Sequence, residues 1–195
     1  SRATLTDAVF ASAVTGHGAE INDFCPSALV QPGPALISSA LAFAERDHLP
    51  GREMLGAVIA GYELTCRISK AVGVQGAAAT GMSSHGFAPV FGVAATVSSM
   101  LHFDEAQIAT ALSYCAQQAS GSLQWVLDVD HIEKSFVFAG MPARNGVQAA
   151  LLVENGFTGV PNIVDQERGW FQAPMFAEGA DYQLDYLTDD LGERF

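Results

Sequence analysis

Apolar residues recur along this chain at the three- and four-residue spacing of an α-helix, and strand-like alternation is absent. The first clear case follows Gly33-Pro34, where the apolar face consists of Leu36, Ala40, Phe43 and Ala44. Proline suits the first turn of a helix because its missing N–H is not needed there, and Pro50-Gly51 ends the pattern. We therefore expect a helix between residues 33 and 50.

Further segments carry the same spacing. One holds Leu55, Val58, Ile59, Tyr62 and Cys66, and it ends at residues 73–81, a stretch rich in Gly and Ala that we expect to be a flexible linker. Two more stripes consist of Phe87, Val90, Phe91, Ala94, Val97 and Leu101, and of Ile108, Leu112, Cys115 and Ala119. Asp104 and Gln107 stand between them in the positions of a capping box. The last helix should run from Pro142 to Glu154 and end before Gly156.

These patterns predict an all-α fold, a helical bundle packed closely through Ala and Gly, with no internal repeat and no clear domain boundary. A chain of 195 residues with 49% hydrophobic content is long enough to bury a sizeable core as one domain. Only 15% of its residues are charged. Part of its surface is therefore expected to be covered, either by more of the same chain or by a partner subunit.

The formal net charge is −12, and the nine Lys and Arg residues are scattered, which argues against nucleic acid as a partner. No uninterrupted apolar run reaches the roughly 20 residues that span a bilayer, and no signal peptide opens the sequence. We expect a cytoplasmic protein without a membrane partner. Three widely spaced cysteines in apolar surroundings fit reduced thiols. Neither they nor the five histidines show the spacing of a metal site, so we expect no metal and no cofactor.

Lys134 is one of only two lysines in the chain, and it lies in a stretch built mainly from Phe, Val, Ala and Gly. Burying an ammonium group costs several kcal/mol unless an anion meets it. Two interpretations remain open from the spacing alone. Either Glu133 and Lys134 lie on a solvated face, or Lys134 meets a substrate carboxylate.

The surrounding residues resemble a known family. Lys134 precedes an aromatic-x-Gly turn at 138–140, a small-residue helix at 143–152, and Gly156-Phe157-Thr158-Gly159. Two other stretches agree, namely Gln31-Pro32-Gly33 followed by Ala40-Leu41-Ala42-Phe43-Ala44-Glu45, and Gly61-Tyr62-Glu63 with Arg67. Together they are similar to the MmgE/PrpD family, whose members include 2-methylcitrate dehydratase, cis-aconitate decarboxylase and iminodisuccinate epimerase.

This resemblance implies that residues 1–195 form a partial N-terminal helical domain, without the α+β lid domain of the family. It implies a homodimer and a cofactor-free lyase acting on a small polycarboxylate. Dehydration of a 2-methylcitrate-like substrate, as in propionate metabolism, is the default reaction. Decarboxylation and epimerisation pass through the same enediolate-like intermediate and stay open. A non-catalytic helical fragment that acts only in packing or dimerisation is the alternative from another class.

The resemblance also assigns site residues. The expected catalytic residues are Glu20, Asp23, His85 and Lys134, and the expected substrate-binding residues are His17, Gln31, His131 and Arg144. His17 to Asp23 resembles the family's HxxDFDD string. Gln31 stands where the family has a histidine, and an amide cannot titrate. If that histidine transfers a proton in relatives, this chain has either lost the chemistry or moved the role to another residue, for which His85, His131 and His17 are the candidates. Lys134, Arg144 and the helix beginning near Pro142 are expected to hold negative charge.

Overall fold

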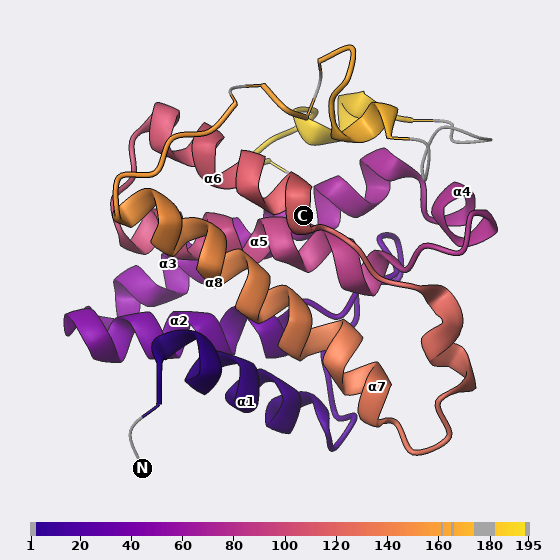
Figure 1. Cartoon of the computed structure of the whole chain (residues 1–195), viewed down its shortest axis with the longest axis horizontal. Coiled ribbons are helices and arrows are strands. Elements are labelled where there is room, and N and C mark those ends of the chain that lie inside the picture. The colour runs from indigo at the N-terminus through magenta and orange to yellow at the C-terminus, as the bar shows by residue number, and fades with distance from the viewer. Residues whose placement is uncertain (1–2, 161, 165, 174–181, 194–195) are drawn as a thin grey trace.

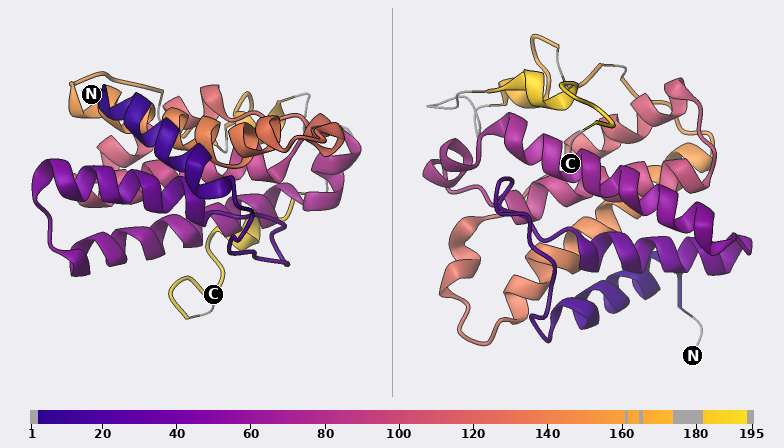
Figure 2. Two further views of the ribbon diagram at one scale, coloured as in Figure 1. Left: turned by 90° about the horizontal axis from the view of Figure 1, so that it is seen from below. Right: turned by 180° about the vertical axis from the view of Figure 1, so that it is seen from behind.

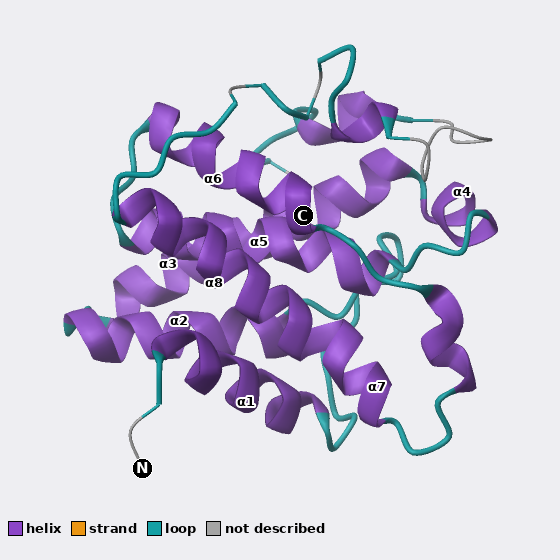
Figure 3. Cartoon of the chain, in the orientation of Figure 1, coloured by secondary structure: helices purple, strands orange, loops and turns teal. Residues whose placement is uncertain are grey.

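The computed structural model describes residues 3–160, 162–164, 166–173 and 182–193. Its α-helices are α1 (Leu5–His17), α2 (Gly33–Asp47), α3 (Gly51–Val72), α4 (Val74–Ala79), α5 (Ser84–Met100), α6 (Glu105–Gln118), α7 (Ile132–Ser135) and α8 (Met141–Glu154) (Figure 1). The 3-10 turns η1 (Leu123–Leu127), η3 (Trp170–Gln172) and η4 (Leu184–Leu187) and the π-helix η2 (Phe136–Gly140) complete them. Within these ranges no strand occurs beyond two isolated bridges, so the predicted all-α class is confirmed (Figure 3).

Helix α5 forms the centre of the bundle. It packs against α3 on one side and α8 on the other, while α2 and α6 also contact it (Figure 2). Almost every residue of α5 is buried, because neighbours surround it. Helix α1 lies across α2, α8 and η2. Of the helices that the structure describes, none has both the length and the apolar character needed to cross a membrane.

Helices α3 and α5 approach each other through glycine. A Cβ placed on Gly92 would lie 1.8 Å from Thr65 Oγ1, and one on Gly61 would lie 2.0 Å from Thr96 Oγ1. Both threonine hydroxyls are buried and donate to carbonyl groups of their own helices, Thr65 to Gly61 O at 2.8 Å and Thr96 to Gly92 O at 3.0 Å. Buried polar groups are thus satisfied without separating the helices, and the predicted packing through small residues is present.

Several expected element boundaries are confirmed. Helix α2 ends at Asp47, ahead of Pro50. The capping box at the start of α6 is complete, since Asp104 accepts from the Gln107 N–H and Gln107 accepts from the Asp104 N–H. Helix α8 ends at Glu154, and Gly156 follows with a positive φ of 82° that glycine adopts easily.

Three expectations about the elements are wrong. Residues 74–79 form helix α4, where a flexible linker was expected. Leu55 and Ile59 are more than half exposed, because the small residues of α3, Ala57 and Gly61, face the core in their place. Third, Pro142 does not lie at the N-terminus of a separate helix. Residues 132–154 are continuously helical through α7, η2 and α8, and this continuity leaves no open helix N-terminus at Pro142 for an anion.

Candidate active site

Lys134 lies at the centre of a cluster of charged and aromatic side chains. Its ammonium is 2.8 Å from Glu20 Oε1, and its side chain is only 17% exposed. The Nζ atom stands 5.7 Å from the ring centre of Trp125 and 5.6 Å from that of Phe138, within the range of cation–π attraction. Glu133 is exposed, whereas Lys134 is not. This placement does not fit the interpretation of Lys134 as part of a solvated face.

Glu20 contacts both Lys134 and His131. It lies in the α1–α2 connection with a φ of 52°, an unusual conformation for a residue other than glycine. Its Oε1 atom accepts from Lys134 and also lies 2.5 Å from His131 Nδ1. Hydrogen bonds from Lys134 and then His131 lower the pKa of the Glu20 carboxyl below its usual value. Glu20 is therefore a carboxylate at neutral pH, held by Lys134 and His131.

His17 connects the end of α1 to both neighbouring segments. Its ring is fully buried and stands edge-on to Phe138. The Nε2 atom is 3.3 Å from Gln31 Oε1, and Nδ1 is 3.1 Å from Ser135 Oγ. Burial lowers the pKa of His17, although the bond to Gln31 and the charge of Glu20 act in the opposite direction. The neutral ring carries one N–H, which can donate to Gln31 Oε1 or to Ser135 Oγ, and the Ser135 hydroxyl itself donates to His131 O at 3.0 Å.

His85 contributes an unpaired nitrogen. It is 7% exposed in the first turn of α5, and its ring stacks on Phe138 with a centroid distance of 3.8 Å. The Trp125 ring stands edge-on to the His85 imidazole, with a centroid distance of 5.8 Å. The buried Nδ1 atom of His85 has no hydrogen-bond partner within the described structure. Burial, with the charges of His17 and Lys134, lowers the pKa of His85 to about 4, so the ring is neutral at pH 7.

The structure thus brings six of the eight predicted site residues together. They are His17, Glu20, Gln31, His85, His131 and Lys134, supplied by the end of α1, the α1–α2 connection, the start of α5 and the segment at α7. These residues are up to 117 positions apart in the sequence. His131 and Lys134 both reach Glu20, as expected for residues one helical turn apart. Their roles in catalysis and binding stay predictions.

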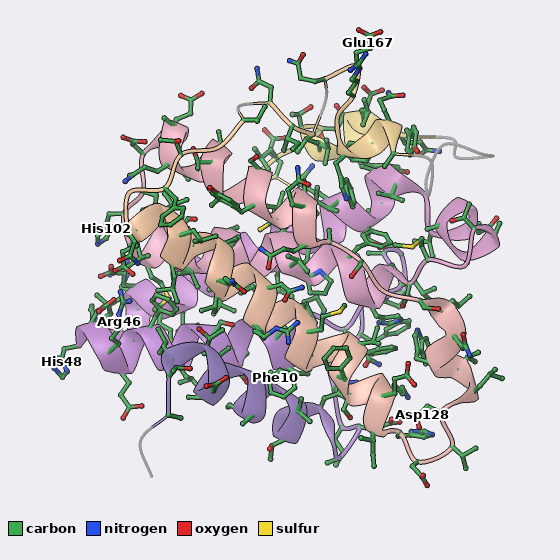
Figure 4. The ribbon with its side chains drawn as sticks, in the orientation of Figure 1. Phe10, Arg46, His48, His102, Asp128 and Glu167 are labelled. Carbon is green, nitrogen blue, oxygen red and sulfur yellow. The ribbon has the colours of Figure 1, made fainter. Side chains whose placement is uncertain are left out.

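Asp23 and Arg144 have other partners. Both carboxylate oxygens of Asp23 lie 3.1 Å from the Gly33 N–H at the start of α2, where a negative charge stabilises a helix. Burial and then the Asp23 charge raise the pKa of the neighbouring Tyr62 hydroxyl. Arg144 bonds Asn145 Oδ1 at 3.2 Å, and its guanidinium stands 6.0 Å from the ring centre of Phe10, which Figure 4 labels beside α8. Neither side chain has a contact with Lys134 or Glu20 among those observed in the described residues.

Two residues of the site were not found from the sequence. Trp125 forms an aromatic wall with Phe138, at a centroid distance of 4.6 Å, and donates from Nε1 to Ser83 Oγ at 2.9 Å. Asp128, labelled ahead of α7 in Figure 4, accepts from the Lys134 N–H at 2.9 Å. Asp128 thereby caps the first turn of the continuous helix at residues 132–154. The sequence pointed to these two residues only through their position, because both lie within ten residues of Lys134.

The cluster combines a carboxylate, an ammonium group, three imidazoles and an amide against a wall of aromatic rings. One side is open, because the side chains of Glu20 and His131 are 33% and 51% exposed, while His17 and His85 form the buried side. Such a site can hold an anionic ligand at the open side and exchange a proton at the buried imidazoles. Within the described ranges, no group of three or more His, Cys, Asp or Glu residues is arranged to hold a metal ion.

This chain is similar to known proteins of one family. The sequence profile of the MmgE/PrpD N-terminal domain matches residues 1–184. A cis-aconitate decarboxylase-like protein, oryM, of Aspergillus oryzae is 27% identical over 192 residues, which cover 90% of this chain and 38% of that protein. The chain therefore spans about two fifths of the length of this curated relative. The chain belongs to the MmgE/PrpD family, as its motifs indicated.

Proposed function

We propose that this chain carries the helical half of the active site of a lyase that acts on a small hydroxy-polycarboxylate, with dehydration of a 2-methylcitrate-like substrate as the reaction. The observation that supports this most directly is the buried, unpaired Nδ1 of His85 beside the Lys134–Glu20 pair. An unpaired buried nitrogen is costly, and its cost is recovered when a ligand supplies the missing hydrogen bond.

Substrate binding follows from the charges. A substrate carboxylate has the same chemistry as the Glu20 carboxylate that bridges Lys134 and His131. In the proposed complex the substrate shares or takes over these two donors. Glu20 then loses the hydrogen bonds that lower its pKa, and its basicity rises. Binding itself would thus convert Glu20 from a stabilised anion into a usable general base.

Proton transfer requires a base next to the carbon that carries the acidic hydrogen and an acid for the departing hydroxyl group. His85 is neutral at pH 7, so it can accept a proton, and a bound anionic substrate would raise its pKa from about 4. In the proposed reaction, Lys134 stabilises the enediolate-like charge that develops on the carboxylate, and its ammonium group beside Glu20 supports this role. Gln31 holds His17 by a hydrogen bond and does not transfer protons.

Decarboxylation is the second candidate reaction, because the relative from Aspergillus oryzae is named a cis-aconitate decarboxylase-like protein. Loss of carbon dioxide needs the same stabilisation of charge next to a carboxylate, followed by protonation of the carbon. The two reactions differ in the group that leaves, which is hydroxide in one and carbon dioxide in the other. Epimerisation would return the proton with neither group lost.

The test uses the full-length protein with 2-methylcitrate, citrate and cis-aconitate in deuterated water, followed by proton NMR. Dehydration predicts an unsaturated product from the first two substrates, and decarboxylation predicts loss of a carbon from cis-aconitate. Deuterium incorporation into unreacted substrate would show proton abstraction alone. A folded protein that gives no product and no deuterium incorporation with any of the three would contradict the proposal and favour a non-catalytic role in packing or dimerisation.

A further inference from the structure

Two of the three cysteines meet where the α1–α2 connection crosses α3. Cys25 begins a tight turn, in which its N–H donates to Val30 O at 3.0 Å and its carbonyl accepts from the Ala28 N–H at 3.2 Å. Ser69 of α3 donates to Ala28 O at 2.5 Å and fastens this turn to the helix. Cys66 lies one helical turn before Ser69, and its thiol is close enough to that of Cys25 for each to shift the pKa of the other. Two cysteines that are 41 positions apart in sequence are thereby brought next to each other.

The surroundings shift the pKa values of the two thiols in opposite directions. Burial alone raises the pKa of the Cys25 thiol, but hydrogen bonds from Ser27, the Ala28 N–H and Cys66 act in the opposite direction. Together with the positive charge of Lys70 they outweigh burial, and the pKa of Cys25 falls below its ordinary value. Burial raises the pKa of Cys66 to about 12, and the neighbouring Cys25 adds to the increase. Cys25 is therefore the better source of a thiolate, and thiolates are the reactive form.

Small molecules can reach this pair. Both cysteines are partly exposed, in contrast to the fully buried Cys115. Cys66 and Lys70 line an open cavity of about 320 Å³, and Lys70 also lines a neighbouring cavity of about 530 Å³ together with Ser27. Either volume exceeds that of a peroxide molecule many times over, since one water occupies about 30 Å³.

We propose that Cys25 and Cys66 form a peroxide-responsive thiol pair that closes to an intramolecular disulfide. The Cys25 thiolate attacks one oxygen of hydrogen peroxide, the O–O bond breaks, and the departing hydroxide takes up a proton to leave as water. Cys25 is then a sulfenic acid. The Cys66 sulfur attacks the Cys25 sulfur, the S–O bond breaks, and the second water carries away the Cys66 proton. Two thiols are oxidised by two electrons, and one peroxide is reduced to two waters.

The disulfide would restrict the α1–α2 connection, which also supplies residues to the candidate active site. The same α1–α2 connection carries Glu20 and Gln31, which contact Lys134 and His17 in the candidate active site. A covalent bond from Cys25 to α3 would restrict this connection and leave the core helices unchanged. Amide hydrogen exchange in residues 18–32 should therefore slow on oxidation, while exchange in α5 should stay the same.

The experiment exposes the reduced full-length protein to a few equivalents of hydrogen peroxide, unfolds it in N-ethylmaleimide and maps its tryptic peptides without reduction. Peptides 3–46 and 53–67 contain Cys25 and Cys66, and peptide 71–134 contains Cys115. We expect the first two to appear as one linked species, and their maleimide labelling to fall together at least about fivefold while Cys115 remains labelled. Dithiothreitol should restore the separate, labelled peptides.

Two variants sharpen the result. In C66S, Cys25 should progress to sulfinic acid because the second thiol is missing, whereas C115S should form the linked peptide as the unchanged protein does. In K70M, oxidation of Cys25 should slow by about two- to fivefold, because the charge that favours the thiolate is lost. Equal labelling of all three cysteines after peroxide, a Cys25 disulfide between two molecules, or linkage that persists in C66S would each overturn the proposal.

Discussion

Glu20 neutralises Lys134 in the free protein, and this pairing explains how a lysine is tolerated in an apolar segment. The ammonium keeps an anionic partner at 2.8 Å and two aromatic faces within 6 Å, so its burial is compensated. A tightly matched internal anion also means that any substrate must compete with Glu20. A di- or tricarboxylate competes better than a monocarboxylate, because it can contact several donors at once.

Replacing Lys134 with Met should separate a catalytic role from a structural one. The substitution keeps the bulk of the stem and removes the charge, so kcat/KM of the full-length enzyme should fall by roughly 10²–10³-fold. The free energy of unfolding should change by no more than about 1 kcal/mol, because Glu20 is one-third exposed and keeps His131 as a partner. Lys70→Met is the matched control, since it removes the other lysine and should leave turnover unchanged. Normal turnover in K134M would remove Lys134 from the site.

His85 should make the stability of the protein depend on pH. Its pKa is about 4 in the folded state and about 6.5 when unfolded, so between these values the unfolded chain binds more protons. The stabilising contribution is complete above pH 6.5 and is lost as the pH falls towards 4, up to about 3 kcal/mol. Urea unfolding at several pH values measures this loss. In H85Q the dependence should flatten across this window, and above pH 6.5 the two proteins should differ by a constant amount. An equally steep dependence in H85Q would show that other groups cause it.

At the scale of whole elements, the crossing of α3 and α5 depends on two glycines. In Gly61→Ala the new methyl group would meet Thr96 Oγ1 at 2.0 Å and the backbone oxygen of Gly92 at 2.8 Å, so one helix must move. We expect a loss of about 1–3 kcal/mol in the free energy of unfolding, measured by urea denaturation. Gly56→Ala in the same helix has open space around it and should instead stabilise by about 0.5–1 kcal/mol. Similar losses in both variants would contradict close packing at Gly61.

Helix boundaries were readable from the sequence wherever local chemistry decides them. The Asp104–Gln107 capping box and the proline in the first turn of α2 are examples, because the capping hydrogen bonds join neighbours in sequence and the first turn needs no N–H from proline. The buried face of α3 was not readable, because Ala and Gly face α5 while the larger Leu55 and Ile59 remain exposed. Hydrophobicity favours large side chains and cannot detect a contact made by small ones.

The candidate site was only partly predictable for a related reason. Motif resemblance singled out His17, Glu20 and Lys134, but the distances between them depend on how α1 lies across η2 and α8. The sequence pattern did not distinguish Asp23 from Glu20, yet Asp23, three residues further along the chain, accepts from the Gly33 N–H. Trp125 has no motif, and its role as a wall follows only from its position against Phe138.

For the whole molecule, the apolar stripe between Phe87 and Leu101 is used within one chain. Helix α5 is almost completely buried by its own neighbours, so its apolar surface gives no support for an interface. The proposed homodimer rests on family membership. Light scattering of the full-length protein at micromolar concentration should give twice the mass of one chain, and a monomer at that concentration would contradict it.

Exposed apolar side chains gather instead around the open side of the candidate site. This apolar rim consists of Ile21, Val126, Leu127, Val129 and Ile132, which are between 66% and 91% exposed. Ile21 adjoins Glu20, Val129 and Ile132 flank His131, and the hydrogen bond between Glu20 and His131 joins the two segments. Exposed apolar side chains close together favour contact with another protein surface. Residues 1–195 expressed alone should therefore self-associate as their concentration rises.

Substitution within the rim tests this directly. Val129→Ser with Ile132→Ser should shift residues 1–195 towards the monomer in sedimentation velocity, because both side chains lose the apolar area that drives association. Leu55→Ser with Ile59→Ser removes a similar exposed area, 57% and 56% exposed, from α3 and is the matched control. If the rim alone is the contact surface, the control pair should leave the association unchanged. Equal effects of the two pairs would mean that association follows general surface hydrophobicity and that the rim is not a specific contact surface.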